Sequence, residues 1–73
     1  MNSVLSDGLR AYEVSEMEVR RREGSWYVVG IVNGFVVSAW CDDERRPRVE
    51  RATCVLVAEY RLVMEDDLGR SAA

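Results

Sequence analysis

The stretch that decides the fold is WYVVGIVNGFVVSAWC, which occupies residues 26–41. Two runs of β-branched and aromatic residues, over 26–32 and 35–41, have the composition typical of strands. Asn33 and Gly34 separate the runs, and both residues tolerate the positive φ angles that a type I′ turn requires. We therefore predict an antiparallel hairpin in which Asn33 and Gly34 form a two-residue loop.

This loop also predicts which side chains share a face of the sheet. Because side chains alternate along a strand, residues that pair across the hairpin point to the same side. One face is expected to carry Val28, Gly30, Val32, Phe35, Val37 and Ala39. The other is expected to carry Tyr27, Val29, Ile31, Val36, Ser38 and Trp40. Gly30 lies in mid-strand, and we expect it to make room for a bulky side chain from the element that covers its face.

A third strand is predicted upstream, over residues 12–22, which are rich in Val and Glu. Its alternation shifts near Glu16 and Met17, as it does at a β-bulge. The sequence Glu-Gly-Ser at 23–25 favours a tight turn into the hairpin. Residues 1–10 are mixed in composition, and we predict a flexible arm there. Side chains alternate along the strand that leads into this turn. The alternation places Met17 and Val19 on the first face of the sheet, and Glu18, Arg20 and Arg22 on the second.

The last segment, over residues 47–66, fits two periodicities. A helical repeat gathers an apolar arc, whereas residues 52–64 also alternate at period two. We predict a helix, because a strand of this length would exceed the usual range of about three to ten residues. Pro47 is tolerated in a first helical turn, and the acidic residues 42–44 suit a helix N-terminus. Residues 68–73 are expected to be a frayed tail. The apolar arc consists of Val49, Ala52, Thr53, Leu56, Val57, Tyr60, Val63 and Met64.

These elements predict an α+β fold, in which one C-terminal helix packs on one face of a three-stranded antiparallel sheet. The chain of 73 residues is too short for two separate cores, so a single small domain is expected. A domain of this size buries only about 60% of the surface that its unfolded chain exposes, so its stability is marginal. Association with another chain is one way in which such small domains gain stability.

The residue types needed for most catalytic sites are scarce. The chain has no histidine, which excludes Ser-His-Asp and Cys-His arrangements. Cys41 and Cys54 lie thirteen positions apart without a CxxC pair, and we expect free thiols instead of a disulfide or a zinc site. The carboxylates of Asp42, Asp43 and Glu44 do not have the spacing of a calcium-binding loop. The glycines form no phosphate-binding motif. We predict no enzyme activity, no metal and no cofactor.

The second face of the predicted sheet is the candidate site, because a single helix can cover only the first. Aromatic and arginine side chains on an open apolar face are typical of binding surfaces. Three interpretations remain open: self-association, docking on another protein, and stacking of single-stranded nucleic acid. The third has the least support, because the net charge is −3. The candidate partner-binding residues are Arg20, Arg22, Tyr27, Val29, Ile31, Val36, Ser38 and Trp40.

The predicted function is a non-enzymatic protein-binding module, with a homodimer as the expected state. In size, charge and lack of catalytic motifs the chain resembles small acidic inhibitors encoded by phages and mobile elements, anti-CRISPR proteins among them. That resemblance would imply an inhibitor that masks a surface of a host protein, and it assigns no site residues. The alternative is a small nucleic-acid-binding transcriptional regulator that uses Arg20, Arg21, Arg22, Arg45, Arg46 and Arg48.

Two further expectations concern the setting of the protein. Residues 1–10 contain charges and no apolar stretch of the kind found in signal peptides, so we expect a cytoplasmic protein. All ten basic residues are arginine, and together with the many alanines, valines and glycines this suggests a GC-rich bacterial or phage genome. The longest apolar run covers residues 54–58, which is far too short to span a bilayer. We therefore expect no membrane partner and no small-molecule substrate.

Overall fold

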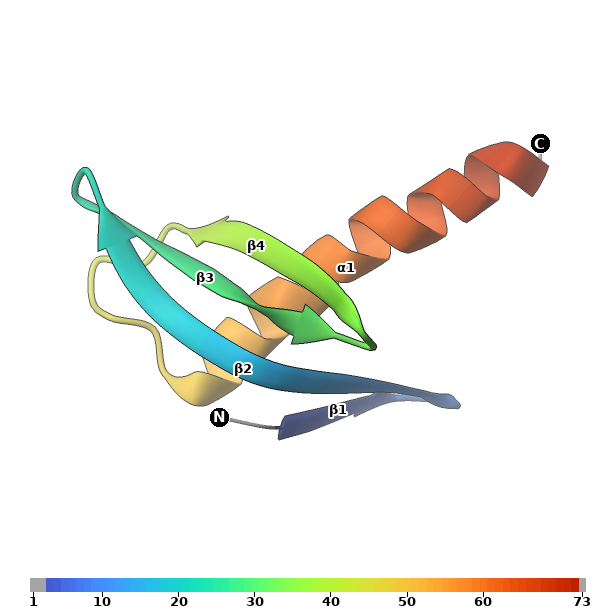
Figure 1. The fold of residues 1–73 in the computed structure, drawn as a ribbon, viewed down its shortest axis with the longest axis horizontal. Coiled ribbons are helices and arrows are strands. Elements are labelled where there is room, and N and C mark those ends of the chain that lie inside the picture. Colours follow the sequence, from blue (N-terminus) through green and yellow to red (C-terminus); the bar gives the residue numbers. More distant parts are fainter. Residues whose placement is uncertain (1–2, 73) are drawn as a thin grey trace.

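The computed structural model describes residues 3–72, with the side chains of residues 3–6 and 8–65. Four strands form one antiparallel sheet in the order β1-β2-β3-β4, and one helix packs against one face of it (Figure 1). The fold class predicted from the sequence is thus confirmed, but the sheet has four strands and not three. The elements are β1 (Ser3–Asp7), β2 (Arg10–Arg22), β3 (Ser25–Val32), β4 (Phe35–Cys41) and α1 (Val49–Ala72).

The β3–β4 hairpin has the register that the sequence predicts. Val32 pairs with Phe35, and the pairing continues without a shift to Trp26 and Cys41. Asn33 has a φ angle of 48° and the following glycine one of 87°, as a type I′ turn requires. The side chain of Asn33 also ties the turn to β2, because its Oδ1 atom accepts a hydrogen bond of 2.9 Å from the backbone N–H of Glu13.

Strand β2 carries the bulge expected near Glu16 and Met17. The register of β2 against β3 shifts between Ser15 and Glu18, and Glu16 has a φ angle of 51°. An extra residue in one strand moves every later side chain to the opposite parity. Val14 before the bulge and Met17 after it are therefore both buried against the helix.

The N-terminal segment is the main correction to the predicted fold. The sequence predicted a flexible arm over residues 1–10, but residues 3–7 form β1, which pairs with β2 through a two-residue turn at Gly8 and Leu9. Gly8 has a φ angle of 63°, which a glycine adopts without strain. The hydroxyl of Ser3 lies 3.1 Å from that of Thr53 on the helix. Pairing with the neighbouring strand β2 and a contact with the distant helix hold this strand, and a short segment of mixed composition does not reveal them.

The C-terminal segment is helical, as predicted, but its bounds differ. Helix α1 begins at Val49 and not at Pro47, and its first turn closes when the N–H of Ala52 donates to the carbonyl of Arg48 at 2.8 Å. The acidic residues 42–44 lie in the preceding loop and not in the first turn. The helix continues to Ala72, so residues 68–72 are helical where a frayed tail was expected.

The core lies between the helix and the sheet, and Gly30 permits their close approach. Leu56 is fully buried, and a Cβ atom added to Gly30 would lie 2.9 Å from its Cδ1 atom. The predicted role of Gly30 is confirmed, since a side chain there would collide with Leu56. The buried cluster consists of Tyr12, Val14, Met17, Val28, Val32, Ala52, Leu56 and Val57.

Helix α1 crosses the sheet at a steep angle, and its C-terminal part projects past β4 (Figure 1). Two tyrosines mark the far end of the packed region, where the rings of Tyr12 and Tyr60 meet edge to face at 5.9 Å. Within residues 3–72, no helix combines the length and apolar character needed to span a membrane.

Candidate functional site

The candidate site is the outer face of the sheet, by which we mean the face opposite helix α1. The pairing of β2, β3 and β4 places all eight predicted partner-binding residues on this face. No helix among the described residues covers it (Figure 1). Val36 is 78% exposed and Trp40 is 60% exposed, whereas Tyr27, Val29 and Ile31 are half-buried by their neighbours.

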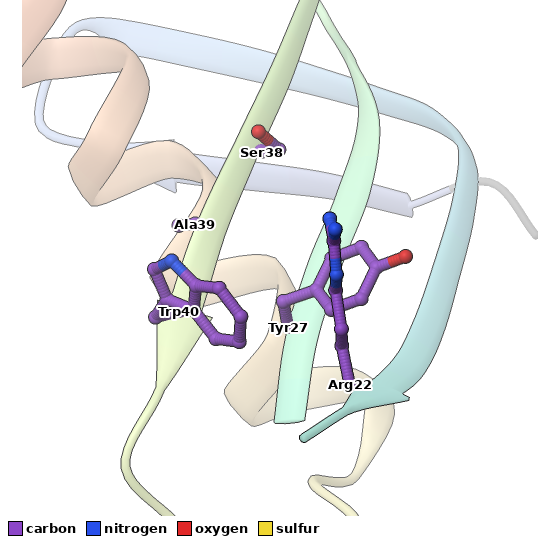
Figure 2. Close-up of a pocket in the computed structure, with 5 residues that line it drawn as sticks. All are labelled: Arg22, Tyr27, Ser38, Ala39 and Trp40. Carbon is purple, nitrogen blue, oxygen red and sulfur yellow. The ribbon is translucent and has the colours of Figure 1, made fainter. Parts of the chain in front are cut away.

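A hollow of about 220 Å³ lies at one end of the outer face (Figure 2). Tyr27 and Trp40 are direct cross-strand partners, and their ring centroids are 5.6 Å apart with planes tilted by 60°. Figure 2 shows Arg22, at the end of β2, beside the Tyr27 ring. Three adjacent strands thus each contribute one large side chain to the hollow, which Ser38 and Ala39 complete.

A second hollow, of about 450 Å³, lies toward the bulge of β2. The apolar residues Val29, Ile31 and Val36 line it, together with the charged residues Glu18 and Arg20. The eight predicted residues divide evenly between the two hollows. The sequence did not place Glu16 there, although the shifted alternation of β2 was a signal that this segment bends. The second hollow is lined by Glu16, Met17, Glu18, Arg20, Val29, Gly30, Ile31 and Val36.

The two arginines of the outer face differ in their electrostatic partners. The Nε atom of Arg20 donates to Oε2 of Glu18 at 2.8 Å, and this hydrogen bond raises the pKa of Arg20. Most of the field of Arg20 is therefore offset by its own strand. The side chain of Arg22 makes no hydrogen bond or ion pair with any residue of the described chain, and its guanidinium remains available at the Tyr27–Trp40 hollow.

The arginines of the alternative nucleic-acid interpretation do not form one surface. Arg21 points to the opposite face of β2, where its guanidinium lies 5.2 Å from the centre of the Trp26 ring. Arg46 and Arg20 line a common hollow at the edge of β2. Arg45 and Arg48 are exposed in the loop that precedes α1. The structure brings together two of these six residues at that edge and leaves the others dispersed.

The two cysteines differ in exposure. Cys41 is buried at the end of β4, and burial, followed by a hydrogen bond with Asp43, raises the pKa of its thiol. A raised pKa lowers the thiolate fraction and makes the group less reactive. Cys54 is exposed on the helix. Among the residues that the structure describes, no three histidine, cysteine or carboxylate side chains gather in a group that could hold a metal ion.

Comparisons with protein-family models, with curated proteins and with solved structures gave no match. The residues of the outer face and their geometry therefore carry the functional argument.

Proposed function

We propose that the chain is a non-enzymatic protein-binding module that uses the outer face of its sheet to mask a surface of a partner protein. The observation that carries the proposal is the hollow between Arg22, Tyr27 and Trp40. It combines two accessible aromatic rings with an arginine that has no partner in the described chain. Tyrosine, tryptophan and arginine are the residues that most often dominate binding energy in protein interfaces.

The apolar character of this face supports the proposal. An exposed strip of valine, isoleucine and aromatic side chains is costly to leave in water, since each buried Å² of apolar surface stabilises by about 25 cal/mol. Val36 and Trp40 are both more than half exposed, and they lie on the same face of β4 on either side of Ser38. A partner that covers both would gain from burial, and Arg22 would orient it.

The nucleic-acid alternative has weaker support. Proteins that bind nucleic acid neutralise several phosphates with a clustered basic surface. Here Arg20 is paired with Glu18, Arg21 lies on the opposite face and the net charge is −3. We therefore give preference to the protein partner and keep nucleic acid as an outcome of the test.

The test is affinity capture from a bacterial lysate, with and without nuclease, using the native chain and two variants. Trp40→Glu places a charge in the aromatic hollow and is expected to abolish capture. Leu9→Glu is the matched control, because Leu9 is a fully exposed apolar residue in the β1–β2 turn. Circular dichroism establishes that both variants keep the fold.

A stoichiometric protein band that survives nuclease and is lost only with Trp40→Glu would support the proposal. Capture that is equal for the native chain and Trp40→Glu would contradict it. Material that disappears on nuclease treatment would favour the nucleic-acid regulator instead.

A further inference from the structure

Strand β4 is an edge strand without the features that normally keep such edges apart. It pairs on one side with β3, and no other described strand pairs with it. Natural proteins protect edges with charges, proline or bulges. Strand β2 extends past its pairing with β1, and that part of its edge is protected by the bulge and by residues 18–22, four of which are charged. The seven residues of β4, FVVSAWC, contain neither a charge nor a proline.

The register shows which backbone groups of β4 are free. In a two-residue hairpin, the residues that flank the loop exchange both hydrogen bonds, and hydrogen-bonded pairs then alternate with pairs that make none. Phe35 flanks the loop, so the odd-numbered residues of β4 direct their N–H and C=O groups toward β3. Val36, Ser38 and Trp40 direct theirs away from the sheet.

These three residues are arranged symmetrically about Ser38. If a second β4 lies antiparallel to the first with Ser38 opposite Ser38, each Val36 lies opposite Trp40 of the other copy. All outward donors and acceptors then meet in hydrogen-bonded pairs. From this edge we infer that a second copy of the chain pairs with β4 about a two-fold axis at Ser38. The two four-stranded sheets then form one continuous eight-stranded sheet.

Helix α1 provides an independent observation that favours the same partner. Val63 lies seven residues after Leu56, which places it on the stripe of the helix that faces the sheet. Leu56 is fully buried, whereas Val63 is 52% exposed, and the C-terminal part of the helix projects past β4 (Figure 1). In the two-fold pair both helices lie on the same face of the joined sheet. The projecting part of each helix then runs beneath the other copy, which covers Val63.

This dimer deepens the proposed function. It rests on that function only in presenting the aromatic hollows as binding sites. The two-fold axis is perpendicular to the sheet, so the outer face stays open and becomes continuous across both copies. Trp40 of one copy then lies beside Val36 of the other, at positions where cross-strand apolar pairs stabilise a sheet. The pair therefore presents two aromatic hollows on one surface.

Sedimentation equilibrium over a wide concentration range tests the dimer, and hydrogen exchange of the backbone amides locates its interface. The native chain is expected to reach twice its mass of 8.3 kDa. The amides of Val36, Ser38 and Trp40 are expected to become protected as the dimer forms. A chain that keeps its single mass at every concentration would overturn the inference, and so would a dimer in which these three amides exchange as fast as in the monomer.

Substitutions separate this inference from the proposed function. Ser38→Lys places two like charges together at the axis, and Val63→Glu places a charge beneath the partner. Each is expected to raise the dimer Kd by about tenfold or more. Ala58→Glu is the control for the helix, because Ala58 is exposed on the side away from the sheet. Unchanged dimerisation of both Ser38→Lys and Val63→Glu would overturn the inference.

The Val63→Glu variant leaves the outer face intact, so it is expected to be monomeric and still to capture a partner through Trp40. A native chain that dimerises but shows no capture that depends on Trp40 would count against the proposed function alone. Capture by a native chain that never dimerises would count against the dimer alone.

Discussion

At the scale of single residues, the contact of Gly30 with Leu56 determines how closely the helix approaches the sheet. A Cβ atom at position 30 would lie 2.9 Å from the Leu56 side chain, 3.3 Å from the Cα atom of Met17 and 3.3 Å from the carbonyl oxygen of Ser15. The leucine can move, but the two backbone atoms belong to the bulge of β2 and have little freedom. Adding a methyl group here overpacks the core.

We therefore expect Gly30→Ala to lower the free energy of unfolding by about 1–3 kcal/mol, measured by urea denaturation. Leu56→Val is the companion variant, because it removes the methyl group nearest to the added one. The two substitutions together should cost less than the sum of their separate effects, since they share one contact. Stability of Gly30→Ala equal to that of the native chain would show that the helix can move away freely.

The residue scale is also where the sequence was most informative. Asn33-Gly34 has a strong local preference for one turn, so the loop and the register of β3 against β4 followed from two residues. The six hairpin residues predicted on the outer face are there for the same reason, and Arg20 and Arg22 follow from the turn at 23–25, since parity propagates along a strand. The availability of Arg22 and the pairing of Arg20 with Glu18 could not be predicted, because they depend on side-chain conformations at a particular distance.

At the scale of elements, the far end of α1 is held to the sheet by polar contacts at Glu65. Its carboxylate accepts a hydrogen bond of 3.0 Å from the hydroxyl of Tyr12 and forms an ion pair with Arg10. Desolvation opposes ionisation of Glu65, but hydrogen bonds from Tyr12, Arg10 and Arg61 outweigh it and lower the pKa of the carboxyl. The ionised form is thus favoured in the folded state.

This pKa shift predicts how stability depends on pH. A carboxyl with a lowered pKa in the folded state stabilises the fold above its ordinary pKa, and the contribution is lost as the pH falls through the folded value. Glu65→Gln should be less stable than the native chain at neutral pH, and the difference should shrink as the pH falls below the ordinary pKa of a glutamate carboxyl. Thermal unfolding across this range measures it, with Glu59→Gln as a control on the same helix. A difference that is constant with pH would contradict the assignment.

The cysteines give a second prediction at this scale, because they report on β4 and α1 separately. Cys54 is exposed and should react with a thiol reagent at once in the native protein. Cys41 is buried and its thiol has a raised pKa, so it should react only as the chain unfolds. Mass spectrometry of the labelled protein should show one modification in buffer and two in denaturant. Rapid double labelling in buffer would show that the end of β4 opens readily.

The elements also show the limits of the sequence. The helix was predictable because a strand over 47–66 would have been too long, but its end at Ala72 was not. Strand β1 was missed because five residues of mixed polarity carry little pattern of their own. It is held by pairing with β2 and by the contact of Ser3 with Thr53, which lie fifty residues apart.

At the scale of the whole molecule, one helix covers one face of the sheet and leaves the other face and the β4 edge accessible. Both accessible regions meet at Val36, Ser38 and Trp40, whose side chains lie on the outer face and whose backbone groups point from the edge. A partner on the face and a second copy at the edge can therefore be bound together. The central claim is that the outer face, and not the helix side, binds the partner protein.

Photo-cross-linking from two matched positions tests this claim most directly. A p-benzoylphenylalanine side chain in place of Tyr27 keeps an aromatic ring on the outer face. The same group in place of Phe35, which is 51% exposed on the helix side, is the control. We predict that irradiation in lysate joins the chain to a polypeptide other than its own second copy from position 27 and not from position 35. Cross-links to such a foreign polypeptide from position 35 alone would contradict the account.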